Sequence, residues 1–143
     1  MHLMKRSLAA AALAAAVLTG CKKEPAPPPP VVETPIAPAV SSLTLGSAVG
    51  ADKRVTAAKD TFGVRDVIYV SIATAGAGEN VKLKAVWTFG AETVRADSLT
   101  LSLTGPAVSE FHISRPRAWP VGAYRVSVTV NDGVAQTRDF AVR

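Results

Sequence analysis

From residue 41 onward, apolar and polar residues alternate along the chain with a period of two. A clear run covers residues 81–89, where Lys82, Lys84 and Thr88 point away from the positions that share one apolar face. Those positions are Val81, Leu83, Ala85, Trp87 and Phe89. Successive side chains of a β-strand point to opposite faces of its sheet, so this pattern predicts a strand with one buried face. No stretch after residue 41 has the periodicity of a helix.

Shorter runs of the same kind recur between turn signals, and each predicts a strand. The other expected strands are residues 43–49, 67–72, 92–95, 99–103, 111–113 and 124–130, and a last one that reaches residue 142, with a glycine-rich turn over 75–80. The last two strands flank Asn131-Asp132-Gly133, and an Asp-Gly step between such runs is a strong hairpin signal. About seven to eight short strands at this spacing predict an all-β fold, a single antiparallel β-sandwich.

Residues 119–126, Trp-Pro-Val-Gly-Ala-Tyr-Arg-Val, resemble the start of strand F in immunoglobulin-like and fibronectin III-like domains. In those domains a tyrosine near the strand start hydrogen-bonds back to the preceding corner, and the resemblance gives Tyr124 that part. Val126 stands where antibody domains carry their second cysteine, and Trp87 matches the buried tryptophan of strand C. The resemblance implies an Ig-like β-sandwich over residues 41–143, held together by core burial without a disulfide.

The N-terminal residues follow a different pattern. Lys5 and Arg6 precede an apolar stretch of about eleven residues that ends at Leu18. A membrane-spanning helix needs about 20 apolar residues, so this stretch is typical of the apolar region of a signal peptide.

The stretch runs into Leu18-Thr19-Gly20-Cys21, which resembles the lipobox of bacterial lipoproteins. In that family the cysteine thiol receives a diacylglycerol, and signal peptidase II then cleaves before the cysteine. The resemblance implies a cleaved signal peptide over residues 1–20 and a membrane anchor on Cys21. Several acyl chains anchor a protein far more stably than one, because each buried CH₂ contributes about 0.8 kcal/mol. The alternative is an ordinary signal peptide with an incidental cysteine.

Position 22 bears on the membrane in which the anchor sits. In enterobacterial lipoproteins an aspartate directly after the lipidated cysteine favours retention in the inner membrane, whereas this chain has Lys22. By that analogy we expect a lipid-anchored protein of the outer membrane that faces the periplasm. The inner membrane and the cell surface are the alternatives.

Residues 21–40 are expected to form the lipidated cysteine and a proline-rich tether. Seven of the ten prolines lie between residues 22 and 40. Proline fixes φ and lacks a backbone donor, so we expect polyproline II, a semi-rigid spacer with a rise of about 3.1 Å per residue. A second interpretation makes Pro27–Pro30 a docking ligand for a partner with an aromatic groove.

Composition excludes several function classes. The 143 residues carry a formal net charge of +5, and removing Lys5 and Arg6 with the signal peptide reduces the 16 basic residues to 14 against 11 acidic ones. Such a mild and scattered excess does not predict nucleic-acid binding, which needs a concentrated basic face. A single cysteine allows no intramolecular disulfide and no cysteine-based metal site.

Catalytic motifs are absent from the sequence. The chain beyond residue 21 has one histidine, His112, no nucleophile elbow and no glycine-rich phosphate loop. Asp52, Asp60 and Asp66 lack the close alternating spacing of a calcium loop. We therefore expect a non-enzymatic protein without a cofactor or a metal. A remote activity that uses His112 ranks last among the hypotheses.

One segment is a candidate interaction site. Arg115, Arg117 and Trp119 lie in a connection stiffened by two prolines, and arginine and tryptophan are favoured at binding hot spots. In the alternative interpretation, Trp119 covers the end of the core and the arginines are merely solvated. Exposed sheet edges are a second candidate, because a partner strand can pair with them.

The leading hypothesis is a membrane-anchored lipoprotein whose Ig-like domain mediates protein contacts in the bacterial cell envelope, with a partner that the sequence does not identify. The alternative is a module that binds peptidoglycan or another periplasmic glycan through Trp119 and the nearby arginines.

Overall fold

A computed structural model of the chain describes residue 20 and residues 24–143. The predicted signal peptide and lipid attachment site, with Leu18, Thr19 and Cys21, lie outside the described residues, apart from the exposed Gly20. Residues 24–38 contain no helix or strand, because seven prolines fix φ and remove backbone donors there. In the described part of the chain, no helix has the length and apolar character that crossing a bilayer requires.

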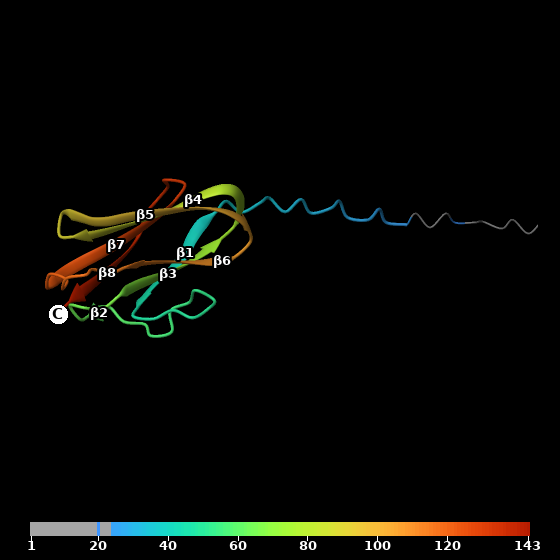
Figure 1. Cartoon of the computed structure of the whole chain (residues 1–143). Coiled ribbons are helices and arrows are strands. Elements are labelled where there is room, and N and C mark those ends of the chain that lie inside the picture. Colours follow the sequence, from blue (N-terminus) through green and yellow to red (C-terminus); the bar gives the residue numbers. More distant parts are fainter. Residues whose placement is uncertain (1–19, 21–23) are drawn as a thin grey trace, which may run out of the picture. The chain divides into compact units, whose positions relative to one another are not determined.

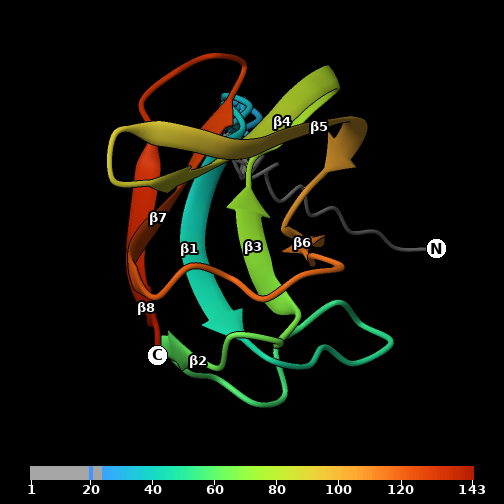
Figure 2. The same cartoon turned by 60° about the vertical axis from the view of Figure 1, so that its left-hand side comes forward.

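Eight strands form the folded part of the chain (Figure 1). Their bounds, in chain order, are β1 Ala39–Gly46, β2 Thr61–Phe62, β3 Ile68–Ala75, β4 Ala77–Phe89, β5 Glu92–Thr104, β6 Ala107–Ile113, β7 Gly122–Val130 and β8 Gln136–Val142. One sheet has the order β1-β3-β6, which Figure 2 shows side by side, and the other has the order β2-β8-β7-β4-β5. The predicted all-β, Ig-like antiparallel sandwich is confirmed; among the described strands, only the two-residue β2 pairs in parallel, with β8.

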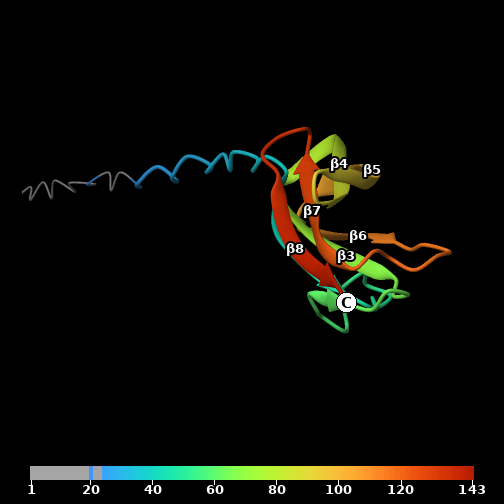
Figure 3. The same ribbon diagram turned by 90° about the vertical axis from the view of Figure 1, so that its left-hand side faces the viewer.

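The two sheets enclose one apolar core. Figure 3 shows β7 and β8 in one layer and β3 and β6 in the other. Trp87 is fully buried and packs edge-to-face against Phe140, with ring centroids 6.0 Å apart. Trp87, which the resemblance matched to the buried tryptophan of strand C, is therefore a core residue, as expected.

The alternation read from the sequence matches the pattern of burial. The four apolar positions of β4 from Val81 to Trp87 are buried, and so are the alternate positions of β7 from Tyr124 to Val130. Trp87 lies opposite Val126 in the antiparallel β4–β7 pair. One wholly buried face on each of two adjacent strands provides the centre of the larger sheet.

The first strand differs from the expectation of residues 43–49. β1 begins at Ala39, because Val40 as well as Leu43 is buried in the core. It ends at Gly46, where a Cβ atom would lie 2.4 Å from the carbonyl oxygen of Ala57. The following loop folds back against this glycine, so the strand cannot extend to residue 49.

The glycine-rich turn expected over residues 75–80 is also shorter. The chain reverses at Gly76, whose φ is 93°, and β4 already begins at Ala77. A Cβ atom at Gly76 would lie 2.4 Å from the carbonyl oxygen of Ala37, and Ala77 N–H donates to the carbonyl of Ile36 at 3.0 Å. This close approach requires glycine at the reversal.

The hairpin predicted at the end of the chain is confirmed. Asn131 and Asp132 both have positive φ, of 50° and 56°, and Gly133 N–H donates to the carbonyl of Val130 at 2.9 Å. Two consecutive residues in this region define a type I′ turn, which matches the twist of the flanking strands. The expected strands 92–95 and 99–103, by contrast, form one continuous strand, β5.

Candidate functional site

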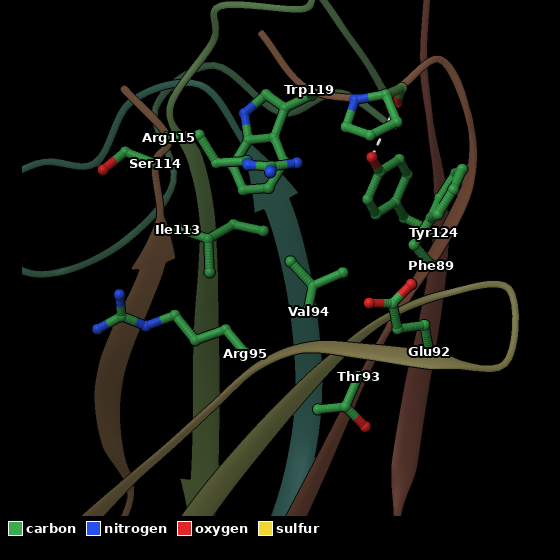
Figure 4. A pocket seen from close by; sticks show the side chains of 11 residues that line it. Phe89, Glu92, Thr93, Val94, Arg95, Ile113, Ser114, Arg115, Trp119 and Tyr124 are labelled. Atoms are coloured by element: carbon green, nitrogen blue, oxygen red, sulfur yellow. Dashed lines mark hydrogen bonds between the residues drawn. The ribbon is translucent and has the colours of Figure 1, made fainter. Parts of the chain in front are cut away.

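The connection between β6 and β7, residues 114–121, contains all three residues of the predicted interaction site. Tyr124 closes this connection: its hydroxyl donates to the carbonyl of Pro120 at 2.8 Å (Figure 4). This is the tyrosine corner that the resemblance implied. Burial raises the pKa of the Tyr124 hydroxyl above its ordinary value, and the positive charge of Arg115 opposes that rise.

Trp119 holds the middle of the connection against the core. Its side chain is only 4% exposed, and its indole N–H donates to the carbonyl of Asp66 at 2.9 Å. Its backbone N–H donates to the carbonyl of Val64 at 2.7 Å. The ring stands edge-to-face to Tyr124 with centroids 6.2 Å apart. Trp119 therefore covers the end of the core and fixes the position of the connection.

The turn that receives Trp119 is itself held by a carboxylate. Asp66 Oδ2 accepts hydrogen bonds from the backbone N–H of Gly63 and from Lys59 Nζ, each at 2.9 Å. The hydrogen bond from Lys59, followed by that from Gly63, lowers the pKa of Asp66 below its ordinary value. Two independent contacts thus order the surface on which the indole rests.

The two arginines are exposed on this fixed connection. The guanidinium of Arg115 lies 5.4 Å from the centroid of the Trp119 ring, a cation–π contact that Figure 4 shows. Arg117 is exposed as well. Within residues 24–143, neither guanidinium has a carboxylate at salt-bridge distance. The structure therefore brings Arg115 and Trp119 together and leaves both arginine charges available to a partner.

A pocket of about 410 Å³ lies beside the connection, between the first residues of β5 and the end of β6 (Figure 4). Val94, Ile113 and Tyr124 contribute apolar surface, while Glu92 and Arg95 add charged groups. Sequence reasoning did not find this pocket, because its walls come from three separate segments. Its lining suits an apolar side chain with polar groups next to it.

His112 lies away from the pocket. It is exposed on β6, where its Nδ1 is 2.7 Å from Glu110 Oε1 and its ring is tilted against Tyr69 at a centroid distance of 5.2 Å. It is not among the residues that line the pocket. Among the residues that the structure describes, no three His, Cys, Asp or Glu side chains gather in a group able to hold a metal ion.

The sheet edges form a second candidate surface. β5 and β6 are the last strands of their sheets, and no hydrogen bond joins them in the described part of the chain. Of the 13 residues of β5 only Leu103 is buried, and Leu99 is 38% exposed. The sequence indicated exposed edges, but it did not indicate that one of them is a single strand of this length.

Comparisons with known proteins support the fold alone. No family model and no curated protein matches the chain. A β-glucosidase from Erythrobacter marinus is similar in structure with a TM-score of 0.51 and 8% identity, over 75% of this chain and 15% of that one. A β-glucosidase from Listeria innocua in complex with glucose has a TM-score of 0.47 and 12% identity, over 74% of this chain and 16% of that one. The CARDB domain of a Pyrococcus furiosus protein has a TM-score of 0.44 and 17% identity, over 70% of this chain and 93% of that domain. The chain thus spans less than a fifth of the glucosidases that it resembles.

Proposed function

We propose that this chain is a non-enzymatic, lipid-anchored protein of the bacterial cell envelope whose Ig-like domain binds another envelope protein. The observation that carries the proposal is the fixed connection of residues 114–121, which presents Arg115 at a pocket of mixed polar and apolar lining and leaves Arg117 exposed. A surface that is already ordered loses little conformational entropy when a partner binds.

The chemistry of this surface indicates the kind of partner. Arginine binds carboxylates through two parallel hydrogen bonds, and such charge-assisted bonds are stronger than neutral ones. The pocket between Val94 and Tyr124 accepts an apolar side chain. We therefore expect the partner to present acidic side chains next to an apolar one.

The anchor and the tether supply the location. Lipid on Cys21 would hold the chain in the outer membrane, facing the periplasm, as the lipobox and Lys22 suggest. Residues 24–38 lack regular secondary structure, and a polyproline II segment rises about 3.1 Å per residue. Such a spacer allows the domain to reach partners away from the membrane surface.

The test is crosslinking in cells, followed by capture from detergent-solubilised membranes and mass spectrometry. We expect the double variant Arg115→Glu/Arg117→Glu to lower the yield of the partner adduct by at least about tenfold, because reversal of two charges removes both carboxylate contacts. Lys53→Glu/Arg54→Glu makes the same charge change in an exposed loop and serves as the matched control. An unchanged adduct in the first variant, or an equal loss in the control, would contradict the proposed surface.

Lipid anchoring is tested separately. Cys21→Ser should abolish incorporation of labelled fatty acid and leave residues 1–20 attached, because no acyl chain can then be attached to residue 21 and cleavage follows that attachment. Unchanged labelling, or a chain of the mature size, would contradict a lipid anchor on Cys21.

The glycan-binding alternative relied on Trp119 and the nearby arginines. The Trp119 side chain is 4% exposed and packs on Tyr124, so a sugar ring has little access to it. Sedimentation of the mature protein with purified cell wall distinguishes the two functions. If the native protein sediments with the cell wall and the Arg115→Glu/Arg117→Glu variant does not, the glycan is favoured as the ligand. If the native protein does not sediment with the cell wall, a protein partner is favoured.

A further inference from the structure

We infer that the free edge of β5 pairs with β5 of a second copy of this chain, antiparallel and about a two-fold axis at Thr100. This surface is separate from the connection of residues 114–121, so the inference goes beyond the proposed function and does not depend on the envelope partner.

The first support is the composition of the edge. Residues 98–104, Ser-Leu-Thr-Leu-Ser-Leu-Thr, carry no charge and no proline. Leu99, Leu101 and Leu103 alternate with small hydroxyl side chains, and Leu99 is 38% exposed. Natural proteins usually block free edges with lysine, proline or a bulge, and a long uncharged edge without them is a template for another strand.

The second support is the position of the bulge in β5. Arg95 lies opposite Trp87 and Thr93 opposite Thr88, so Val94 is an extra residue on β5. A bulge disrupts regular pairing where it occurs. A register centred on Ala96 would place the bulge inside the paired segment, whereas a register centred on Thr100 pairs residues 98–102 and leaves both the bulge and Asp97 outside the paired segment.

The Thr100 register also matches side chains. It places Leu99 opposite Leu101 of the second copy, and Ser98 opposite Ser102. Directly opposite residues of an antiparallel pair lie on the same face with their Cβ atoms about 4.5–5.5 Å apart, so the two leucines cover each other. The strand is therefore complementary to itself when it is read in the reverse direction.

The other edges are less suited to pairing with a second copy. The side chains of Gln136 and Arg138 donate to the carbonyls of Val40 and Leu43, which occupies the β1 edge. β2 has only two residues. A two-fold pairing of β6 about its centre would place Glu110 opposite Glu110, and like charges directly opposite are destabilising.

Attachment to one membrane would favour even a weak contact of this kind. Confinement of two tethered copies to the same surface raises their effective concentration, so pairing that is weak in dilute solution becomes populated. The inference therefore calls for a measurement in the native membrane.

The test is cysteine crosslinking of the full chain in membranes under mild oxidation. Opposite residues of an antiparallel pair have Cα atoms about 4.5–5.5 Å apart, within the range of a disulfide, so we expect Thr100→Cys to give dimers about tenfold more abundant than Val134→Cys. Val134 is 94% exposed and lies in the β7–β8 hairpin, which makes it a matched control. The unsubstituted chain gives the background level of dimers that form through Cys21.

Two further variants make the result specific to the register. Ser98→Cys/Ser102→Cys should form dimers, whereas Ser98→Cys alone should form few, because Ser98 then faces a serine. Leu99→Lys should lower the Thr100→Cys dimer, and thermal unfolding checks that this exposed substitution leaves the domain folded. Monomers alone, equal dimers from Val134→Cys, or adducts with another protein at residue 100 would each overturn the inference. The Arg115→Glu/Arg117→Glu variant should still form dimers, which separates this outcome from that of the proposed function.

Discussion

The two open sides of the sandwich differ in whether side chains form hydrogen bonds across the gap between the sheets. On the β1–β8 side, Gln136 Nε2 donates to the carbonyl of Val40 at 2.7 Å and Arg138 Nε donates to that of Leu43 at 3.1 Å. On the β5–β6 side, no hydrogen bond joins the sheets in residues 24–143, and Leu99 of β5 is 38% exposed. The first side is closed by its own side chains, and the second is left available.

Because of this difference, we expect the β1–β8 side to contribute to the stability of the domain and the β5–β6 side to contribute to its association with other chains. On the β1–β8 side, Gln136 and Arg138 hydrogen-bond across the gap and Leu43 is buried, so substitutions at these residues are expected to lower the free energy of unfolding. On the β5–β6 side, β5 is paired with β4 along its length, but nearly all of its side chains are exposed or half-buried, so substitutions at its exposed residues are expected to change association instead. The predictions below test this division, from the largest expected effect to the smallest.

The largest difference is expected between two leucines in edge strands. Leu43 of β1 is 4% exposed, and Leu43→Ala should lower the free energy of unfolding by about 2–5 kcal/mol, the range for truncation of a core leucine. Leu99→Ala in β5 should lower it by less than about 1 kcal/mol, because the side chain is already partly in water. Urea unfolding of both variants measures the two values. Similar losses would show that β5 is as important to stability as β1.

A smaller effect is expected at the tyrosine corner. Tyr124→Phe removes the hydrogen bond to the carbonyl of Pro120 and should cost about 1 kcal/mol. Tyr69 is half-buried, and its hydroxyl has no hydrogen-bond partner among the described residues, so Tyr69→Phe is the matched control and should change stability little. Urea midpoints at constant slope give the comparison. Equal shifts in the two variants would mean that the corner hydrogen bond adds nothing.

A still smaller effect is expected where Arg138 closes the β1–β8 side. Arg138→Met keeps the aliphatic chain and removes the donor to the carbonyl of Leu43, at a cost of roughly 0.5–1 kcal/mol. Hydrogen exchange should report faster exchange of β1 amides near Leu43. Arg54→Met, which alters an exposed loop residue, should leave those amides unchanged. Unaltered exchange in Arg138→Met would contradict the role of this side chain in closing the sandwich.

The smallest effect is expected from Asp66 and depends on pH. The pKa of Asp66 is lowered in the folded state, so its contribution to stability is fully present above the ordinary value of 3.8 and is lost as the pH falls through the folded value. Asp66→Asn lacks this titration, so its stability should decline less steeply than that of the native chain below about pH 4. Urea midpoints at several pH values compare the two. Parallel curves would mean that Asp66 does not contribute to the acid sensitivity.

The sequence predicted those features that depend on a buried face or on local turn chemistry. Alternation in residues 81–89 predicted β4, the Asp-Gly step predicted the last hairpin, and the corner motif predicted the hydrogen bond of Tyr124. Each signal comes from residues close together in the chain. The fold class followed from several such signals.

Features that depend on distant segments were missed. β5 was predicted as two short strands, because Arg95 and Asp97 interrupt the face that carries Leu99, Leu101 and Leu103. The bond from the Trp119 indole to the carbonyl of Asp66 joins residues 53 positions apart, and no local pattern indicates it. The pocket likewise exists only where three segments meet.

Site-specific photo-crosslinking in cells would test most directly whether contacts form on the β5–β6 side. A photoreactive residue is placed at Thr100 and Arg117 on or near the open side, and at Ser42 and Thr137 on the closed side, all of which are exposed. The division between the two sides predicts dimers from position 100, adducts with one envelope protein from position 117, and neither from positions 42 and 137. Adducts of equal yield from positions 42 and 137, or none from positions 100 and 117, would contradict it.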